Sequence, residues 1–319
     1  MHGRTRRSVL TSSLAGSVGC LLGTVNPLGV SAQPAANSSD LGAGEADAIE
    51  TTELARDLFL VQTGPTNSVA LRDPSGLTLI DGTSTAAAPR LITALADLAE
   101  GNRVHTLVNT HWHSEHTGLN VELGENGARI VAQQNTRLWL TTDITYPWDN
   151  SHFAPLDPAG QPQEDFFDRL NLAEGVDCGH LPHAAHTDGD LYVRFAESNV
   201  LAVGDAVCGD GWPLVDWWTG GWIGGIVGTL ENVLELTDAE TRIVPARGGV
   251  LSRSTVEEQF EMYNVIFNRL AELLNRGRSP DEAVEARPTA EYDDNMGGAS
   301  EQFVRRAFES LWAYLSPDA

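Results

Sequence analysis

The chain contains no lysine. All 20 of its basic residues are arginine, and they stand against 44 aspartates and glutamates, which gives a formal net charge of −24. Nucleic acids and anionic membrane surfaces are bound through clustered positive charge. The acidic balance therefore argues against both as partners. The 319 residues, 41% of them hydrophobic, are enough to build one large domain or two small ones.

Long apolar runs are also missing after the N-terminus, and no later segment approaches the roughly 20 apolar residues of a membrane span. Residues 1–32 are different: Arg6 and Arg7 precede an apolar stretch that ends in the small residues Val30-Ser31-Ala32. This arrangement resembles a twin-arginine export signal. We predict cleavage after Ala32 and export to the periplasm or beyond. An uncleaved N-terminal membrane anchor and a lipid on Cys20 are the alternatives.

Cysteine is scarce. Of three cysteines, only Cys178 and Cys208 remain after the predicted cleavage. Two cysteines in an exported protein can form a disulfide, and we expect one here. Two buried thiols, or one thiolate that binds a metal, are the other interpretations.

Residues 33–50 are small, polar and acidic, and they predict a linker. Beyond them, short apolar runs alternate with turn residues and amphipathic segments. Two groups of strands, each with helices outside, predict a helix–sheet–sheet–helix sandwich. The predicted strands are 57–64, 67–73, 77–82, 104–110, 129–133, 190–197, 199–205 and 241–246, and the predicted helices are 85–101, 135–143, 225–237, 254–277 and 299–315.

Residues 110–118 read THWHSEHTG and follow the buried strand 104–110 directly. His111 and His113 are two residues apart and can turn toward one centre, and His116 follows one helical turn later. Imidazole suits zinc, with carboxylates such as Glu115 as a harder supplement. Sites in α/β proteins gather on loops at strand ends. The stretch therefore predicts a metal centre.

The sequence HWHSEH resembles the HxHxDH motif of the metallo-β-lactamase superfamily. Downstream, HTDGD with His186 and NVLAVGD with Asp205 match further motifs of that family, and LIDGTS with Asp81 matches an earlier one. The resemblance covers roughly residues 51–250. It implies a four-layer αββα sandwich in a hydrolase domain at 51–319, closed by C-terminal helices. The metal ligands that it implies are His111, His113, Glu115, His116, His186 and Asp205.

Two positions depart from the family's pattern. Glu115 replaces the aspartate of HxHxDH, which moves the carboxylate by roughly 1.5 Å, one carbon–carbon bond. Arg247, in TRIVPARGG, occupies the place of the last histidine ligand. A guanidinium is permanently charged and cannot bind a metal. We expect one firmly bound zinc, with Arg247 paired to Glu115 or Asp205 or reaching an anionic substrate; weak binding of a second ion stays open.

The resemblance implies hydrolysis of a small molecule. Zinc lowers the pKa of its bound water to about 7, so that hydroxide attacks a carbonyl at neutral pH. The carbonyl belongs to an ester, lactone, amide, thioester or lactam, and a β-lactam is one candidate. The predicted catalytic residues are Glu115 and Asp205, which orient the water and transfer a proton, together with Arg247.

Half of the tryptophans lie in GWPLVDWWTGGWIGG, at 211–225. Packing under a long loop is the first interpretation of this segment, with Asp216 as a structural hydrogen-bonding group. The second is an apolar wall over the metal, which favours a substrate with an apolar portion.

Other polar residues near the motifs receive mainly structural roles. Asp188 belongs to a turn, whereas Asp190 is placed to support a ligand histidine. His180 and His183 are interpreted as local structure, with His183 as the substitute if His186 is not a ligand. His105, inside a strand, is expected to be a hydrogen-bonded core histidine.

Two other functions compete with the hydrolase. One is a non-catalytic protein that binds a metal or small ligand, because Arg247 disables the second metal position. The other is an iron-dependent redox enzyme that uses His111, His186 and Asp205. The identity of the metal separates the redox enzyme from the hydrolase. The sequence leaves the substrate and the oligomeric state open.

Overall fold

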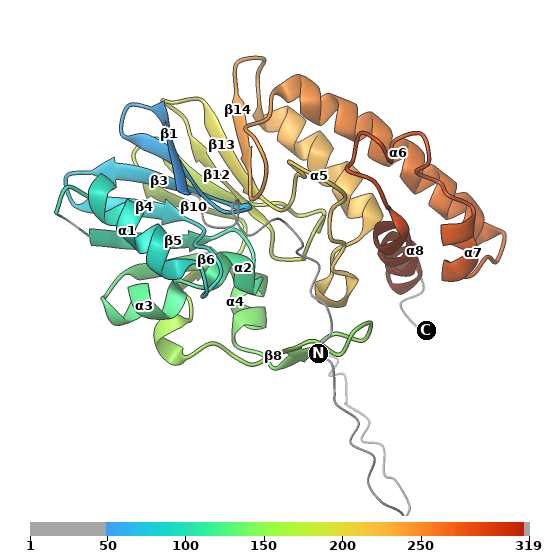
Figure 1. Cartoon of the computed structure of the whole chain (residues 1–319), viewed down its shortest axis with the longest axis horizontal. Coiled ribbons are helices and arrows are strands. Elements are labelled where there is room, and N and C mark those ends of the chain that lie inside the picture. Colours follow the sequence, from blue (N-terminus) through green and yellow to red (C-terminus); the bar gives the residue numbers. More distant parts are fainter. Residues whose placement is uncertain (1–48, 102, 316–319) are drawn as a thin grey trace, which may run out of the picture. The chain divides into compact units, whose positions relative to one another are not determined.

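The computed structural model describes residues 49–101 and 103–315 (Figure 1). The predicted signal at 1–32 and the linker up to residue 48 lie outside these residues. Strand β1, Ile49–Ala55, begins two residues inside the range predicted as linker. Within the described part of the chain, no helix is both long and apolar enough to cross a membrane.

The first sheet has seven strands in the order β1-β2-β3-β4-β5-β6-β9. Its first four strands are antiparallel, and β4, β5, β6 and β9 run parallel. The bounds after β1 are β2 Leu58–Thr63, β3 Thr66–Asp73, β4 Gly76–Ile80, β5 Arg103–Asn109, β6 Arg129–Gln133 and β9 Glu164–Phe166.

The second sheet has five strands in the order β10-β11-β12-β13-β14, of which the last two are parallel. The predicted hairpin of residues 190–205 is confirmed as β12 and β13. A separate small hairpin pairs β7, Ile144–Thr145, with β8, His152–Phe153. The bounds in the second sheet are β10 Arg169–Ala173, β11 Val176–His180, β12 Leu191–Phe195, β13 Val200–Gly204 and β14 Arg242–Pro245.

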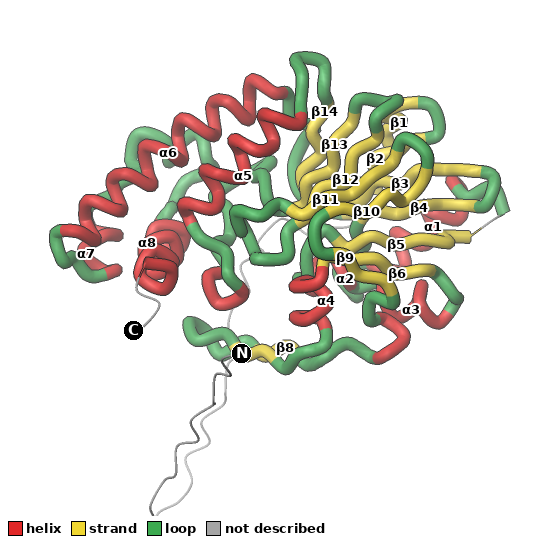
Figure 2. Tube along the Cα trace, turned by 180° about the vertical axis from the view of Figure 1, so that it is seen from behind, coloured by secondary structure: helices red, strands yellow, loops and turns green. Residues whose placement is uncertain are grey.

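Helices cover the outer faces of both sheets (Figures 1 and 2). The helices of the first half are α1 Ala88–Leu98, α2 Ser114–Thr117, α3 Asn120–Glu125 and α4 Gln134–Leu140, with a 3₁₀ turn η1 at Pro158–Gly160. Those of the second half are α5 Ile223–Leu236, α6 Arg253–Asn275, α7 Pro280–Glu285 and α8 Glu301–Leu315, with η2 at Trp217–Thr219.

The apolar pattern of β13 shows how the layers form. Val200 and Ala202 belong to the cluster between the two sheets, whereas Leu201 and Val203 belong to the cluster shared with α5, α6 and α8. Successive side chains of a strand point to opposite faces, so a wholly apolar strand is buried on both. A third cluster joins α1 and α3 to the first sheet. The four-layer αββα sandwich with C-terminal helices is thus confirmed.

The C-terminal helices pack against the tryptophan-rich loop. The Trp212 ring stacks on Phe303 of α8 with centroids 4.7 Å apart, and Trp222 stacks on Tyr314 at 4.0 Å. The Trp217 indole donates to Glu309 of α8. Packing, the first interpretation of this loop, therefore accounts for three of its four tryptophans, while Trp218 is 47% exposed.

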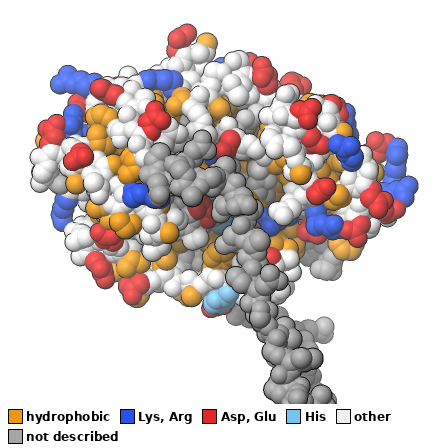
Figure 3. Space-filling view, viewed as in Figure 1, with side chains coloured by type: hydrophobic (Ala, Val, Ile, Leu, Met, Phe, Trp, Pro, Cys, Tyr) orange, Lys and Arg blue, Asp and Glu red, His pale blue; other side chains and the backbone are white. Residues whose placement is uncertain are grey.

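Charged side chains of both signs are interspersed on the face seen in Figure 3. Many arginines pair with carboxylates; Arg72, for example, contacts Asp57 and Glu100, and Arg269 contacts Glu291. Because these arginines are paired and interspersed with carboxylates, they do not gather into one positive patch on this face. Each of these pairs contributes little to stability.

A close approach fixes the histidine stretch against the loop after β4. Gly118 donates its backbone N–H to the Thr83 carbonyl at 2.8 Å, and Gly82 donates to the His116 carbonyl at 2.7 Å. A Cβ on Gly118 would lie 2.3 Å from the Thr85 nitrogen. Only glycine allows the two loops to approach this closely, so the position of His116 depends on Gly118.

The expected disulfide between Cys178 and Cys208 is absent, and both residues are free thiols. Cys178 lies on β11 in the core between the sheets. Cys208 lies in the loop after β13, where its Sγ donates to the carbonyls of Asp210 and Gly211. Neither thiol belongs to a metal-binding group of the described residues. The alternative of two buried thiols holds for Cys178, whereas Cys208 is a free thiol that is half-buried.

Burial raises the pKa of each thiol to about 12. Because the thiolate is the reactive form, both cysteines should resist alkylation in the folded protein and react fully in denaturant without a reductant. Peptide mass spectrometry after iodoacetamide treatment measures this directly. A linked Cys178–Cys208 peptide pair in non-reduced protein would contradict the structure.

Candidate metal centre

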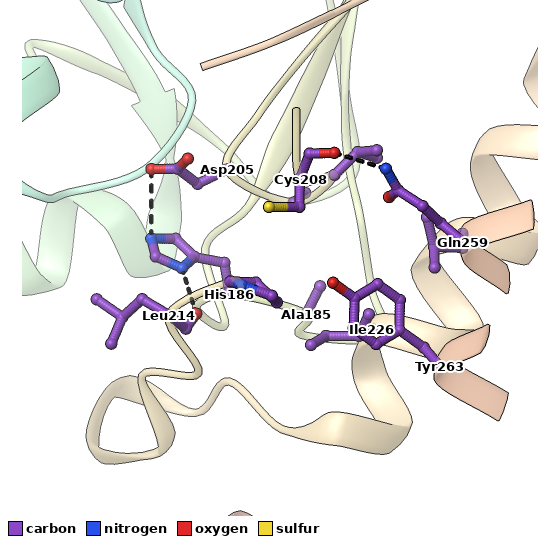
Figure 4. A pocket seen from close by; sticks show the side chains of 12 residues that line it. Ala185, His186, Asp205, Cys208, Leu214, Ile226, Gln259 and Tyr263 are labelled. Atoms are coloured by element: carbon purple, nitrogen blue, oxygen red, sulfur yellow. Dashed lines mark hydrogen bonds and ion pairs between the residues drawn. The ribbon is translucent and has the colours of Figure 1, made fainter. Parts of the chain in front are cut away.

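Three loops deliver five of the predicted ligands to one edge of the sandwich. His111 and His113 follow β5, and His116 lies in α2 directly after them. His186 lies between β11 and β12, and Asp205 follows β13. β5 and β13 are largely buried strands that end at this edge. The sheets therefore fix where the loops after these two strands begin. Figure 4 shows Asp205 facing the ring of His186.

Three histidines form the first group of possible metal ligands. One ring nitrogen from each of His111, His113 and His186 lies within 4.8 Å of the others, and all three residues are at most 3% exposed. His113 Nδ1 lies 2.8 Å from His186 Nε2. Nitrogens bound to one tetrahedral zinc stand roughly 3.3 Å apart, given bonds of about 2.0–2.1 Å. A small outward movement of the rings would accommodate the ion.

An unpartnered nitrogen supports this fit. His111 Nε2 is buried and has no hydrogen-bond partner. A buried polar atom without a partner is costly, and a metal ion would satisfy it. His186 Nδ1 donates to the Leu214 carbonyl at 2.8 Å, which leaves the lone pair of the neutral ring on Nε2. A set of three imidazoles suits zinc, copper, iron or nickel.

Asp205 joins a second group with His111 and His116. Its Oδ2 lies 3.1 Å from His116 Nε2, 3.6 Å from His111 Nε2 and 3.9 Å from His186 Nε2. Burial alone would raise the pKa of Asp205. The hydrogen bond from His116 and the charge of Arg247 outweigh burial and hold that pKa well below its usual range. Asp205 is therefore an ionised carboxylate that faces both groups.

Arg247 lies on the opposite side of this carboxylate. Its Nε is 3.4 Å from Asp205 Oδ1, and its side chain is 34% exposed. This pairing is one of the two that the sequence predicted. The charge of Asp205, followed in size by that of Glu115, raises the pKa of Arg247 despite its partial burial. The guanidinium thus places a fixed positive charge beside Asp205 while staying accessible from solvent.

Glu115 is the one predicted ligand that the structure leaves out of both groups. Its side chain is half-buried at the start of α2. Burial would raise the pKa of Glu115, but the neighbouring charges of His113 and His116 lower it. Glu115 therefore acts on the site as a negative charge rather than as a member of the ligand cluster.

Two buried aspartates hold the ligand-bearing loops in place. Asp81 accepts hydrogen bonds from the Thr110 N–H at 2.8 Å and from its hydroxyl at 2.6 Å, and that hydroxyl contacts His111 Nδ1 at 3.1 Å. Asp190 accepts from the His186 N–H at 2.8 Å. Asp190 thus supports a predicted ligand through its backbone rather than through its ring.

Three further histidines of the described residues form local contacts. His180 Nε2 donates to the Asp188 carbonyl at 3.0 Å, and the ring of His183 lies over Gly228 of α5. His105 Nε2 contacts Asp73 Oδ2 at 3.1 Å. His105 is hydrogen-bonded as predicted, but it is half-buried on β5 rather than part of the core.

A small cavity of about 10 Å³ lies behind His186 and Asp205, lined also by Cys208, Gln259 and Tyr263 (Figure 4). It offers room for about one water molecule. The Tyr263 hydroxyl and the side-chain oxygen of Gln259 are buried without partners.

The chain is similar to known proteins in sequence and in fold. The family model for the metallo-beta-lactamase superfamily matches residues 61–252. The solved DIM-1 metallo-beta-lactamase superposes with a TM-score of 0.55 at 15% identity, covering 68% of this chain and 97% of that one. Comparison with curated protein sequences gives no match.

Two further solved structures show the same fold. The metallo-beta-lactamase FIM-1 from Pseudomonas aeruginosa, in its mono-zinc form, gives a TM-score of 0.55 at 13% identity over 69% of this chain and 96% of that one. A metallo beta lactamase from Hirschia baltica gives 0.52 at 15% identity over 67% and 97%. With a family model that spans more than half of its length, the chain belongs to the metallo-β-lactamase superfamily.

Proposed function

We propose that this protein is an exported hydrolase that uses one zinc ion to cleave an ester, lactone, thioester or lactam. The observation that carries the proposal is the buried group of His111, His113 and His186, whose ring nitrogens converge within 4.8 Å. Nothing in a packed core requires three histidines in such proximity, and the buried His111 Nε2 has no hydrogen-bond partner, which is costly. A metal ion explains why they converge.

When bound, such an ion polarises a carbonyl oxygen and lowers the pKa of a coordinated water. The chain supplies the remaining roles. Asp205, ionised and facing the ligand nitrogens, is placed to orient the attacking water and to accept a proton from it. The same group then returns the proton to the leaving group.

Arg247 supports binding of an anionic group. It is one-third exposed, whereas its partner Asp205 is 8% exposed, so the guanidinium offers its outer N–H groups to a substrate without leaving its ion pair. Arginine binds carboxylates and oxyanions through paired N–H donors. Glu115 adds negative charge beside the histidines and contributes to retention of the cation.

The one-ion proposal follows from the same arginine. A second dication close to Asp205 would stand next to a permanent positive charge, and the repulsion would weaken its binding. FIM-1, a solved relative in its mono-zinc form, gives a precedent for one ion on this fold.

Elemental analysis of the purified, exported protein should find about one zinc per chain. The Arg247→His variant should rise toward two, because it removes the positive charge and adds an imidazole ligand. The matched control is Arg278→His, at an exposed position outside both groups of possible ligands. This variant should still bind about one zinc per chain. Two tightly held zinc ions in the native protein would overturn the one-ion proposal.

The His111→Ala variant should lose more than about 100-fold in kcat/KM, since removing a ligand costs at least as much as removing a residue that supports one. A panel of chromogenic esters, lactones, thioesters and β-lactams provides the measurement. His183→Ala, which removes a histidine outside the ligand groups, is the control and should retain activity.

Other results on the same panel would favour the competing functions. A native protein that binds zinc and a small ligand but hydrolyses none of the substrates would point to a binding protein. Iron at full occupancy, with oxygen-dependent turnover, would point to a redox enzyme instead.

Export to the periplasm is tested through the two arginines of the signal. Replacing both Arg6 and Arg7 by lysine should leave the precursor in the cytoplasm, whereas the control Arg4→Lys should not. Cell fractionation and mass determination provide the readout. Exported protein should begin at Gln33, and a lipidated product that begins at Cys20 would contradict the predicted cleavage.

A further inference from the structure

A fully buried carboxylate lies behind the metal centre. Asp216 is 0% exposed, in the loop between β13 and α5. Its Oδ2 accepts hydrogen bonds from Tyr146 Oη at 2.9 Å, from Thr219 Oγ1 at 2.5 Å and from His113 Nε2 at 3.0 Å. Three donors on one buried oxygen leave little freedom for the carboxylate to rotate.

This contact determines which nitrogen of His113 faces the metal centre. A carboxylate only accepts hydrogen bonds, so the hydrogen of the neutral imidazole resides on Nε2. The lone pair then lies on Nδ1, which is the nitrogen 2.8 Å from His186 Nε2. The Asp216 contact therefore selects the tautomer and the ring orientation that metal binding requires.

The carboxylate is itself fixed to the loop of another ligand. The Asp216 N–H donates to the His186 carbonyl at 3.1 Å, and the Gly221 N–H donates to the Asp216 carbonyl at 2.9 Å. One residue thus contacts the ring of His113 through its side chain and the backbone of His186 through its amide. The two ligands are held at a defined separation through Asp216.

Aromatic rings shield this hydrogen-bond network from water. Tyr146, from the β7–β8 hairpin, lies between Trp148 at 4.2 Å and Phe153 at 5.1 Å between ring centroids. Trp112 is 3% exposed, and its indole donates to Thr219 Oγ1 at 3.1 Å. In an environment of low dielectric, hydrogen bonds to a charged group are stronger than in water.

We propose that Asp216 is the positioning residue of His113, supported by Tyr146, and that this pair sets the affinity of the three-histidine group for its metal ion. The inference rests on the proposed zinc site and deepens it. Partners that orient a ligand histidine typically contribute 10- to 100-fold in metal affinity, about as much as we assign to Asp216.

The test measures zinc affinity by competition with a chromophoric chelator, and thermal unfolding with and without zinc. Asp216→Asn should bind zinc roughly 10- to 100-fold more weakly, because the amide keeps the shape but loses the charge. Tyr146→Phe should lose roughly 2- to 10-fold, the worth of one hydrogen bond. The matched control is Asp188→Asn, which removes a carboxylate that pairs with Trp139 rather than with a histidine, and it should bind zinc as the native protein does.

The double variant Asp216→Asn with Tyr146→Phe sharpens the test. Tyr146 Oη contacts both Asp216 Oδ2 and His113 Nε2 at 2.9 Å, so the three side chains form one hydrogen-bond network and the losses of the double variant should be less than additive. Additive losses would overturn the role given to Tyr146. If Asp216→Asn fails to fold, Thr219→Val takes its place: it removes a hydroxyl that donates to Asp216 Oδ2, and it should weaken zinc binding.

Unchanged zinc affinity in Asp216→Asn, with equal falls in unfolding temperature with and without zinc, would overturn the proposal and leave a purely structural aspartate. This outcome is distinct from failure of the hydrolase. A native protein that binds zinc tightly but cleaves no substrate would refute the activity, while a weakened Asp216→Asn would still support the positioning role.

Discussion

The buried carboxylate of Asp205 is the constraint on which the site depends. It is 8% exposed, and an isolated ionised carboxylate cannot be buried without compensating positive charge. The fold supplies that charge from two directions: His116 at 3.1 Å on one oxygen and Arg247 at 3.4 Å on the other. A cation among the histidines would add a third source, and it would allow the rings to stay neutral while the carboxylate stays charged.

Bringing these groups together requires the two sheets to present their strand ends at one edge. The sandwich does so because β5 and β13 are apolar on both faces and sit inside the stack of layers. Each ligand then follows its strand within a few residues. Flexible loops alone would not hold the site, so Asp81 and Asp190 fix the backbones of two ligand segments, and the close approach at Gly118 fixes a third.

Sequence reasoning identified the parts of this arrangement whose signal is local. The strand 104–110 with its following histidines, the hairpin at 190–205 and the long helices all carry continuous apolar patterns, and each is present. β1 was missed because its residues are largely polar and exposed at the edge of the sheet. Segments of four to six residues are too short to show a clear apolar period. The elements missed for this reason include the strands β10 and β11 and the helices α2, α3 and α7.

The contacts around the site were harder to predict than the ligands. The motif residues lie close together in the sequence, but their supports do not. Asp216 is 103 residues from His113, and Tyr146 is 70 residues from Asp216. No spacing rule links such positions, because the loops that join them fold back over the sheets. The expected Cys178–Cys208 disulfide is absent for a similar reason. Cys178 lies in the core between the sheets, whereas Cys208 lies in the loop after β13.

Arg247 shows how one substitution changes the electrostatics of a site without changing the fold. A histidine at this place would be a neutral ligand, and charge balance at Asp205 would then depend on a second ion. The arginine supplies a permanent charge from within the chain, so the carboxylate remains ionised whether or not that ion is bound. Its partial exposure also leaves N–H donors available to an incoming anion. The arginine therefore places a fixed cation beside Asp205, and in the function proposed above the same cation binds an anionic group of the substrate.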